Sequence, residues 1–280
     1  MAEICYNQPD FDYRREAGLN QSSLKKILDS PAHYQVALKH RFLPTPAMEI
    51  GTAVHSLVLD GEDAFNASYV KKPDNINLTT KDGKAWKADQ GRKKILTTGG
   101  KDDVWNAIHG MAKSLQRLEW YRNTGDEYIK RNEVSIYWDW LGQKCKARLD
   151  SVLVDEGIIL DLKSTDSINP ELFTKKVVSL GYDFQAGFYA KAAEEAYGKP
   201  FRFIFVAVER KPPYDVDLFE VDQEMMEEGL VKCIAALRTY STCKSLDMWP
   251  SKDPTIKMLS YPAWHKKYGT LSTDLEEVCF

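Results

Sequence analysis

The sequence predicts an α/β protein in which a central mixed β-sheet is flanked by helices. Arg148 to Thr165 contains two short apolar runs on either side of an Asp-Glu-Gly turn, which is typical of a β-hairpin. Residues 202–209 are almost continuously apolar, as expected for a strand that is buried on both faces. Apolar residues recur at helical spacing in other segments, among them residues 182–197.

Composition and charge limit the classes of protein to which the chain can belong. Of the 280 residues, 43% are hydrophobic, which suffices for a sizeable core, and the formal net charge is −3. A site for a polyanion would therefore have to be a local basic cluster. No apolar run reaches membrane-spanning length, residues 1–20 lack the apolar centre of a signal peptide, and the five cysteines include no Cys-x-x-Cys pair. We expect a cytoplasmic protein with reduced cysteines, no membrane contact and a single domain over residues 1–280.

The first part of the chain is predicted to be helical after an irregular start of nineteen residues. A helix is expected over residues 19–28, with Asn20 as its cap, and a second one over residues 48–59. Gly51 and His55 are neighbours on the second helix, where a glycine costs about 1 kcal/mol relative to alanine. A close approach of backbone or ligand beside His55 would explain this glycine.

The remaining elements follow from the same kinds of pattern. In chain order we expect a basic stretch over residues 71–101, a helix from Asp102, a strand over 133–140, the hairpin, a charged loop up to Leu180, a helix over 182–197, strands over 202–209 and 216–221, a helix over 226–240 and a tail over 246–280.

Charged side chains stand at the ends of the two apolar runs of the hairpin. Asp150 opens the first run, Asp161 closes the second, and Lys163 follows two residues later on the same face of the strand. Buried charge is costly unless it is paired or coordinates a metal ion. These residues are therefore either a structural ion pair or part of a metal-dependent site.

Other polar residues have both a structural and a functional interpretation. Ser22 lies in the first turn of its helix, where free N–H groups favour an anion, but a serine there also serves as a cap. His55 is either a core histidine or a metal ligand. Gln185 and Tyr189 share one helix face. Residues 71–101 are either a solvated, mobile flap or a contact surface for a phosphate backbone.

The order of these motifs resembles that of the PD-(D/E)XK nuclease superfamily. The chain has a Gly-x-x-x-His helix, an aspartate that opens the hairpin, Asp-x-Lys about ten residues later and a helix with Gln-x-x-x-Tyr. More closely, the segments LNQSSLKKILDSP, GTAVHSLVLD, SIYWD, RLDSVLVDEGIILDLKST, YDFQAGFYA and WP…TIKMLSYPAW resemble the RecE-type (exonuclease VIII-like) recombination exonucleases of phages and prophages. The resemblance extends from about residue 18 to residue 268.

This resemblance implies a restriction-endonuclease-like core and a role for each motif. Residues 130–245 would form the nuclease core, with the helices of residues 19–60 and the basic flap packed on it. The implied roles are ligation of metal by His55, Asp150, Asp161 and the backbone carbonyl of Leu162, catalysis by Lys163 with both aspartates, positioning of DNA by Gln185 and Tyr189, and binding of the 5′-terminal phosphate by Ser22 and Arg15.

The function that the resemblance implies is a Mg²⁺-dependent deoxyribonuclease that degrades the 5′ strand of double-stranded DNA ends in the 5′→3′ direction. Carboxylate oxygens suit Mg²⁺, for which Mn²⁺ would substitute, and two ions about 4 Å apart would serve one phosphate. The 3′ overhang would pass to a single-strand-annealing protein of the RecT/Beta type, and the enzyme would be a trimeric or tetrameric ring in the bacterial cytoplasm.

Three alternatives to this function are open. The first is a RecB-like nuclease of other polarity or substrate, such as an endonuclease or a single-strand nuclease. The second is a non-catalytic protein that binds DNA ends during recombination. In the third, a cytosolic binding protein, the aspartates and Lys163 would form a structural ion pair.

Overall fold

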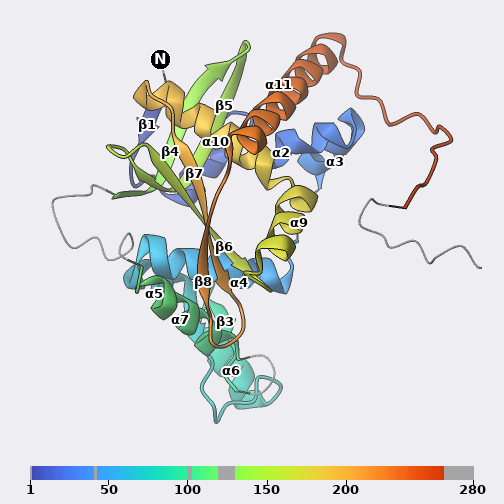
Figure 1. Cartoon of the computed structure of the whole chain (residues 1–280). Coiled ribbons are helices and arrows are strands. Elements are labelled where there is room, and N and C mark those ends of the chain that lie inside the picture. The colour runs from blue at the N-terminus through green and yellow to red at the C-terminus, as the bar shows by residue number, and fades with distance from the viewer. Residues whose placement is uncertain (1, 41–42, 100–102, 119–129, 262–280) are drawn as a thin grey trace, which may run out of the picture.

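The computed structural model describes residues 2–40, 43–99, 103–118 and 130–261, and within them six strands form one mixed sheet (Figure 1). Only β6 and β7 run parallel; the other neighbouring strands are antiparallel. The predicted α/β class with a central mixed sheet is thus confirmed. Across the sheet the strands are β1 (Glu3–Cys5), β4 (Lys130–Trp140), β5 (Gln143–Leu153), β6 (Ile158–Thr165), β7 (Arg202–Glu209) and β8 (Val216–Glu220).

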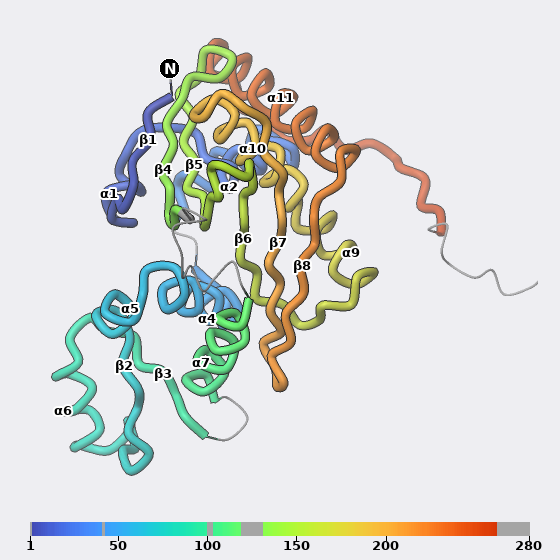
Figure 2. Tube along the Cα trace, turned by 60° about the vertical axis from the view of Figure 1, so that its left-hand side comes forward, coloured from blue at the N-terminus to red at the C-terminus, as the bar shows by residue number. Residues whose placement is uncertain are grey.

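Helices cover both faces of this sheet (Figures 1 and 2). One face is covered by α2 (Gln21–Leu24), the 3₁₀ helix η1 (Lys25–Leu28), α3 (Pro31–Lys39), α9 (Pro170–Leu180), α10 (Tyr182–Tyr197) and α11 (Gln223–Leu246). The other is covered by α4 (Pro46–His55), the π-helical turn η2 (Ser56–Asp60), α5 (Glu62–Ser68) and α7 (Val104–Leu115).

Strand β7 shows why its sequence is almost continuously apolar. Phe203 and Phe205 are buried in the core on the α10 side, whereas Ile204, Val206 and Val208 are buried on the α7 side. Because side chains alternate across a strand, a strand with helices on both faces needs apolar residues at every position. The prediction for residues 202–209 is confirmed.

The hairpin predicted around residues 155–157 is also present. Antiparallel pairing of β5 with β6 is confined to three residue pairs, of which Ser151 and Leu160 are the last before the strands separate. Gly157 has φ +66°, a conformation that L side chains rarely adopt, so the tight turn requires glycine here. The two strands therefore leave the turn together and then diverge.

Near the N-terminus, the predicted helix begins as expected but changes its geometry. The Asn20 side chain accepts a hydrogen bond from the Ser23 backbone N–H and caps α2, which continues as η1. The irregular start predicted for the first nineteen residues is wrong, because β1 pairs with β4 and α1 (Asp10–Arg15) follows it. Pairing with a strand more than a hundred residues away has no local signal.

The charged loop predicted up to Leu180 is wrong, because this segment contains α9. Asn169 accepts hydrogen bonds from two backbone N–H groups of the first turn, and Pro170 occupies the first helical position. Phe173 and Val177, one turn apart, are buried against the sheet. These two apolar positions and the cap stabilise a helix whose other side chains are charged or exposed.

The basic stretch predicted as a flap contains regular structure. β2 (Tyr69–Lys71) pairs in parallel with β3 (Lys94–Leu96), and α6 (Lys81–Asp89), capped by Thr80, lies between them in the chain. Figure 2 shows these elements below α4 and α5, apart from the large sheet. Residues 100–102, at the end of the stretch, lie outside the described residues.

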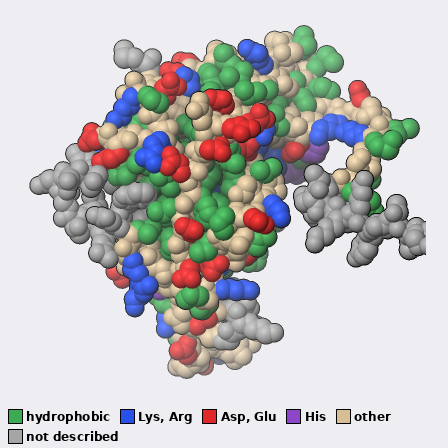
Figure 3. Space-filling view, viewed as in Figure 1, with side chains coloured by type: hydrophobic (Ala, Val, Ile, Leu, Met, Phe, Trp, Pro, Cys, Tyr) green, Lys and Arg blue, Asp and Glu red, His purple; other side chains and the backbone are tan. Residues whose placement is uncertain are grey.

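The tail carries no helix or strand over residues 248–261, and residues 262–280, which include part of the motif TIKMLSYPAW, lie outside the described residues. Within the described ranges, no helix combines the length and the apolar character that crossing a bilayer requires. On the face drawn in Figure 3, acidic and basic side chains are interspersed. This face therefore presents no uniform positive field.

Two glycines allow α10 and α11 to lie backbone against backbone. A Cβ on Gly187 would stand 2.6 Å from the backbone nitrogen of Leu230, and one on Gly229 would stand 2.1 Å from the carbonyl oxygen of Asp183. Real Cβ atoms do not tolerate such distances, so the two helices would have to move apart if either glycine were replaced.

We expect Gly187→Ala to lower the free energy of unfolding by about 1–3 kcal/mol, because the overpacking outweighs the better helix propensity of alanine. Urea denaturation followed by circular dichroism measures the change. Glu194→Ala, at an exposed position of the same helix, is the control and should shift the value by no more than about 0.5 kcal/mol. An unchanged stability of Gly187→Ala would contradict the close packing.

Candidate active site

The separation of β5 from β6 places two carboxylates side by side. Asp150 and Asp161 are the first residues beyond the paired part of the two strands. The Leu162 backbone N–H donates to Asp150 Oδ2 at 2.8 Å, so the carboxylate takes the place of a strand carbonyl. Because the N–H and C=O of one strand residue point to the same side, we expect the Leu162 carbonyl to face this gap as well.

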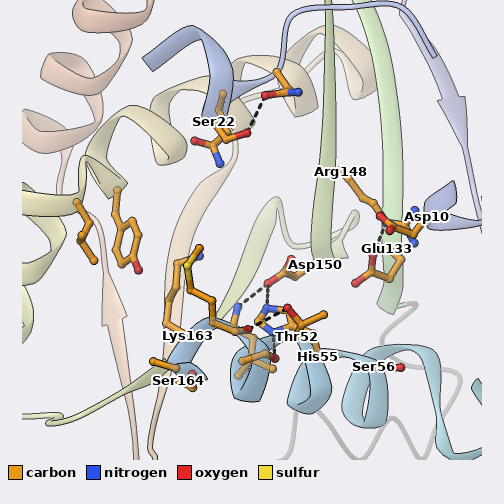
Figure 4. Close-up of a pocket in the computed structure, with 18 of the residues that line it drawn as sticks. Asp10, Ser22, Thr52, His55, Ser56, Glu133, Arg148, Asp150, Lys163 and Ser164 are labelled. Carbon is orange, nitrogen blue, oxygen red and sulfur yellow. Dashed lines mark hydrogen bonds and ion pairs between the residues drawn. The ribbon is translucent and has the colours of Figure 1, made fainter. Parts of the chain in front are cut away.

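Helix α4 brings His55 into the gap (Figure 4). His55 Nε2 lies 3.0 Å from Asp150 Oδ2, and Nδ1 lies 2.8 Å from the carbonyl oxygen of Gly51, to which it donates. A Cβ on Gly51 would lie 3.2 Å from Ser164 Oγ. Glycine at this position therefore lets α4 approach β6 closely. This is the close approach beside His55 that the sequence predicted as the reason for a glycine within the helix.

The second carboxylate is held from two sides. Lys163 Nζ forms an ion pair with Asp161 Oδ2, and Gln185 Nε2 donates to Asp161 Oδ1 at 2.6 Å. The ammonium group of Lys163 also lies 4.8 Å from the ring centroid of Tyr182. Only 1% of the Asp161 side chain is exposed, and its Oδ2 accepts no well-oriented hydrogen bond from the described residues. The Lys163 ammonium is thus the positive partner of Asp161 Oδ2.

A cavity of about 1470 Å³ opens over these residues, and six of the predicted site residues line it. Asp161 and Gln185 are buried and do not line it. The lining residues among those predicted are Ser22, His55, Asp150, Lys163 and Tyr189, together with Leu162.

Ser22 and Arg15 differ in their relation to the cavity. Ser22 is exposed, its hydroxyl donates to Asn20 Oδ1 at 2.8 Å, and it stands across the cavity from Asp150 and Lys163 (Figure 4). Arg15 does not line the cavity, and its guanidinium lies 5.2 Å from the ring centroid of Phe11. The neighbouring Arg14 lines the cavity instead. The structure thus does not bring Arg15 together with the other predicted site residues.

Sequence reasoning missed a second ion pair in the cavity wall. Glu133 and Arg148 form an ion pair in which both side chains are largely buried. Glu133 has φ +51° and interrupts the pairing of β4 with β5. Its neighbours Asn132 and Val134 pair with Ser151 and Leu149, so Glu133 lies across from Asp150. Burial and the Asp150 carboxylate raise the pKa of Glu133 to about 7. The only sequence signal was that Arg148 is two residues before Asp150 in a strand.

The charges of the site depend on one another. Burial alone would lower the pKa of His55, but the Asp150 carboxylate raises it to about 9. Burial would raise the pKa of Asp150, but His55 and Lys163 hold it below its ordinary value. Burial raises the pKa of Asp161 to about 6, while the two carboxylates raise that of Lys163 despite its burial. At neutral pH two positive groups therefore face two carboxylates.

The chemistry of these donors fits a divalent cation. Two carboxylates, an imidazole and a strand carbonyl are ligands that Mg²⁺ or Mn²⁺ accepts. Within the described residues, however, no three His, Cys, Asp or Glu side chains are grouped as a complete metal site. The ligand set His55, Asp150, Asp161 and Leu162 therefore stays a prediction.

The pKa of His55 leads to a test of this charge arrangement in buffer with EDTA. A group whose pKa is raised from 6.5 to about 9 on folding stabilises the protein fully below pH 6.5, and this stability is lost as the pH rises through 9. We expect the difference in unfolding free energy between the wild type and His55→Gln to shrink by about 3 kcal/mol from pH 6 to pH 9.5.

Urea denaturation at several pH values measures this difference. In an Asp150→Asn background, His55→Gln should show no such pH-dependent difference, because the charge that raises the pKa is gone. A difference that stays constant between pH 6 and pH 9.5 would mean that Asp150 does not keep His55 protonated.

Comparison with known proteins agrees with this fold. No curated protein matches the chain. A crystal structure of a "Putative exonuclease" from Eubacterium rectale is similar, with a TM-score of 0.56 and 17% sequence identity over 84% of this chain and 87% of that chain. The structure of SSO0001 covers 68% of this chain and 86% of its own, with a TM-score of 0.28 and 12% identity.

The family comparison covers most of the sequence. Residues 20–259 match the family described as PDDEXK-like domain of unknown function (DUF3799). Together with the similarity of fold, this match confirms the restriction-endonuclease-like class and the resemblance to the PD-(D/E)XK superfamily. The chain belongs to the PDDEXK-like family DUF3799.

Proposed function

We propose that the protein is a Mg²⁺-dependent exonuclease that degrades the 5′ strand of double-stranded DNA ends in the 5′→3′ direction. One observation carries the proposal: His55, Asp150, Asp161 and Lys163 form one charged group beneath a large cavity. The PDDEXK-like family of the chain supports a nuclease, and the motifs that resemble RecE-type exonucleases support the polarity. His55, Asp150, Asp161 and the Leu162 carbonyl would hold Mg²⁺, and Mn²⁺ would substitute.

Each side chain of the site has a separate task in this proposal. Divalent cations, when bound, neutralise charge on the phosphoryl oxygens and make water a better nucleophile. Gln185 orients the Asp161 carboxylate, and the Leu162 N–H orients that of Asp150. Lys163, kept protonated by the two carboxylates, offsets negative charge that develops in the transition state. Tyr189, which lines the cavity, positions the DNA strand.

The strand end would be recognised on the opposite side of the cavity. Ser22 is exposed there, and its hydroxyl is available for a 5′-terminal phosphate if it exchanges its hydrogen bond with Asn20. Arg14, which lines the cavity, is better placed than Arg15 to supply a positive charge. A site for the terminal phosphate across the cavity from the carboxylates would make cleavage depend on a 5′ end of the DNA.

The single-stranded 3′ product would pass to a single-strand-annealing protein, and the enzyme would act as a trimeric or tetrameric ring in a bacterial host. Exposed apolar side chains on α3 and α9 supply surface that such an assembly could bury, among them Val36, Leu38, Leu172 and Val178. Light scattering of the purified protein measures the number of subunits.

We expect Asp161→Ala and Lys163→Ala each to lower the rate of Mg²⁺-dependent DNA degradation by at least about 10²-fold, because the first removes a proposed Mg²⁺ ligand and the second removes the positive charge that offsets the transition state. Release of labelled nucleotides from linear duplex DNA measures the rate, with circular dichroism as a check on folding. Lys191→Ala, at a partly exposed position of α10 that does not line the cavity, is the control and should retain the wild-type rate. Folded variants with full activity would refute the assignment.

The dependence on DNA ends requires a separate comparison of substrates. We expect the wild type to degrade linear duplexes from the 5′-labelled strand, to prefer a 5′-phosphate over a 5′-hydroxyl, and to spare closed circular DNA. Gel analysis of strand-specific labels measures this preference. Cleavage of closed circles would identify an endonuclease, and degradation from the 3′ end would identify an exonuclease of the other polarity.

A further inference from the structure

A second hollow, of about 590 Å³, adjoins the main cavity. Thr52, Ser68 and Tyr69 line both of them, so the two hollows share a wall. Beyond this wall, the second hollow is lined by the basic triplet, which we define as Arg92, Lys93 and Lys94. The triplet lies at the start of β3, in the segment that the sequence left open between a flap and a contact surface.

The shared wall places the basic triplet close to the candidate active site. Thr52 and His55 are three residues apart on α4 and therefore lie about 4.5 Å apart along the helix axis. Thr52 faces both hollows, whereas His55 lines the main cavity. A polymer that leaves the main cavity on the α4 side would thus meet the triplet after a short distance.

The charge of this region is suited to a polyanion. Residues 71–99 contain eight Lys and Arg but three Asp, in a chain whose formal net charge is −3. Lys94 forms an ion pair with Glu49 at 3.3 Å, which joins β3 to α4. Arg92 and Lys93 are exposed and have no ion pair with a described residue. Two cations therefore remain available beside the hollow.

We propose that the second hollow and the basic triplet bind the phosphate backbone of duplex DNA as it continues from the candidate active site. This inference rests on the proposed function, because the main cavity supplies the reacting end of the same duplex. Lysine and arginine side chains attract phosphates irrespective of sequence, and the hydroxyl group of Ser68, which lines the second hollow, can donate to a phosphate oxygen. The triplet then adds affinity without reading bases.

The test compares two double variants that remove the same charge from the same part of the chain. Arg92→Ala/Lys93→Ala alters the hollow and breaks no described ion pair. Lys84→Ala/Lys87→Ala removes two exposed lysines of α6 that line neither hollow. Lys94 is left unchanged because its loss would leave Glu49 unpaired.

Binding of a 5′-phosphorylated duplex is measured by fluorescence anisotropy in EDTA, over a range of KCl concentrations. We expect Arg92→Ala/Lys93→Ala to weaken binding by about 10-fold at moderate salt and to lower the slope of log K against log[KCl] by about 2. The α6 variant should change the affinity by less than about 2-fold. Equal losses in both variants, or no loss in the first, would overturn the inference.

The binding test does not depend on cleavage, so the two proposals can fail separately. If the wild type binds duplex DNA but degrades none in Mg²⁺, the proposed nuclease fails while the binding comparison still decides the role of the triplet. If it degrades DNA and the first variant binds normally, the triplet has no part in DNA binding. Thermal unfolding of both variants shows whether they are folded.

Discussion

A buried carboxylate, Asp161, and a largely buried one, Asp150, lie where β5 and β6 separate, and the surrounding elements are arranged to neutralise them. An unpaired carboxylate in such a place would be strongly destabilising. Asp161 is paired with Lys163 and Gln185, and Asp150 with His55 and the Leu162 N–H. The partners come from α4 on one face of the sheet and α10 on the other. The charged group therefore connects both helical layers to the centre of the sheet.

The same arrangement explains why the site can serve chemistry as well as stability. His55 is positively charged because Asp150 raises its pKa. A cation that binds both carboxylates would therefore displace the extra proton of His55 and leave the side chains in place. In the absence of metal, the two carboxylates also raise the pKa of Lys163 and keep it charged. Under the proposed function, the same carboxylates would pair with His55 and Lys163 before a divalent ion binds. Fold alone does not establish activity, and these side chains carry the argument for it.

The main cavity and the second hollow together would contact several phosphates of one DNA backbone. The main cavity contains fixed acids at its base, and positive side chains are distributed along its walls and into the neighbouring hollow. A chain with a formal net charge of −3 attracts a polyanion only where such cations gather. Localised charge of this kind favours binding along a defined path over binding to the whole surface.

The local sequence was sufficient to predict the hairpin, the buried strand β7, the helix α10 and the Asn20 cap, because each depends on periodicity or on a turn within a few residues. It also predicted that Asp161 and Lys163 share one face, since that follows from strand geometry alone. It could not predict β1, whose partner strand is far along the chain. It also could not predict α9, a mostly polar helix that is held on the sheet by one buried aromatic and one buried aliphatic side chain.

Local sequence pattern therefore specified the central elements around the hairpin and the types of donor atom at their ends. Packing between elements specified which of these donor atoms meet. The docking of α1 through β1 brings Arg14 rather than Arg15 to the cavity, and an interruption of the β4 ladder places Glu133 across from Asp150. The packing of α4 allowed by Gly51 brings His55 to within 3.0 Å of Asp150. Such distances depend on how whole elements pack, and residues far apart in the chain carry no local pattern that specifies them.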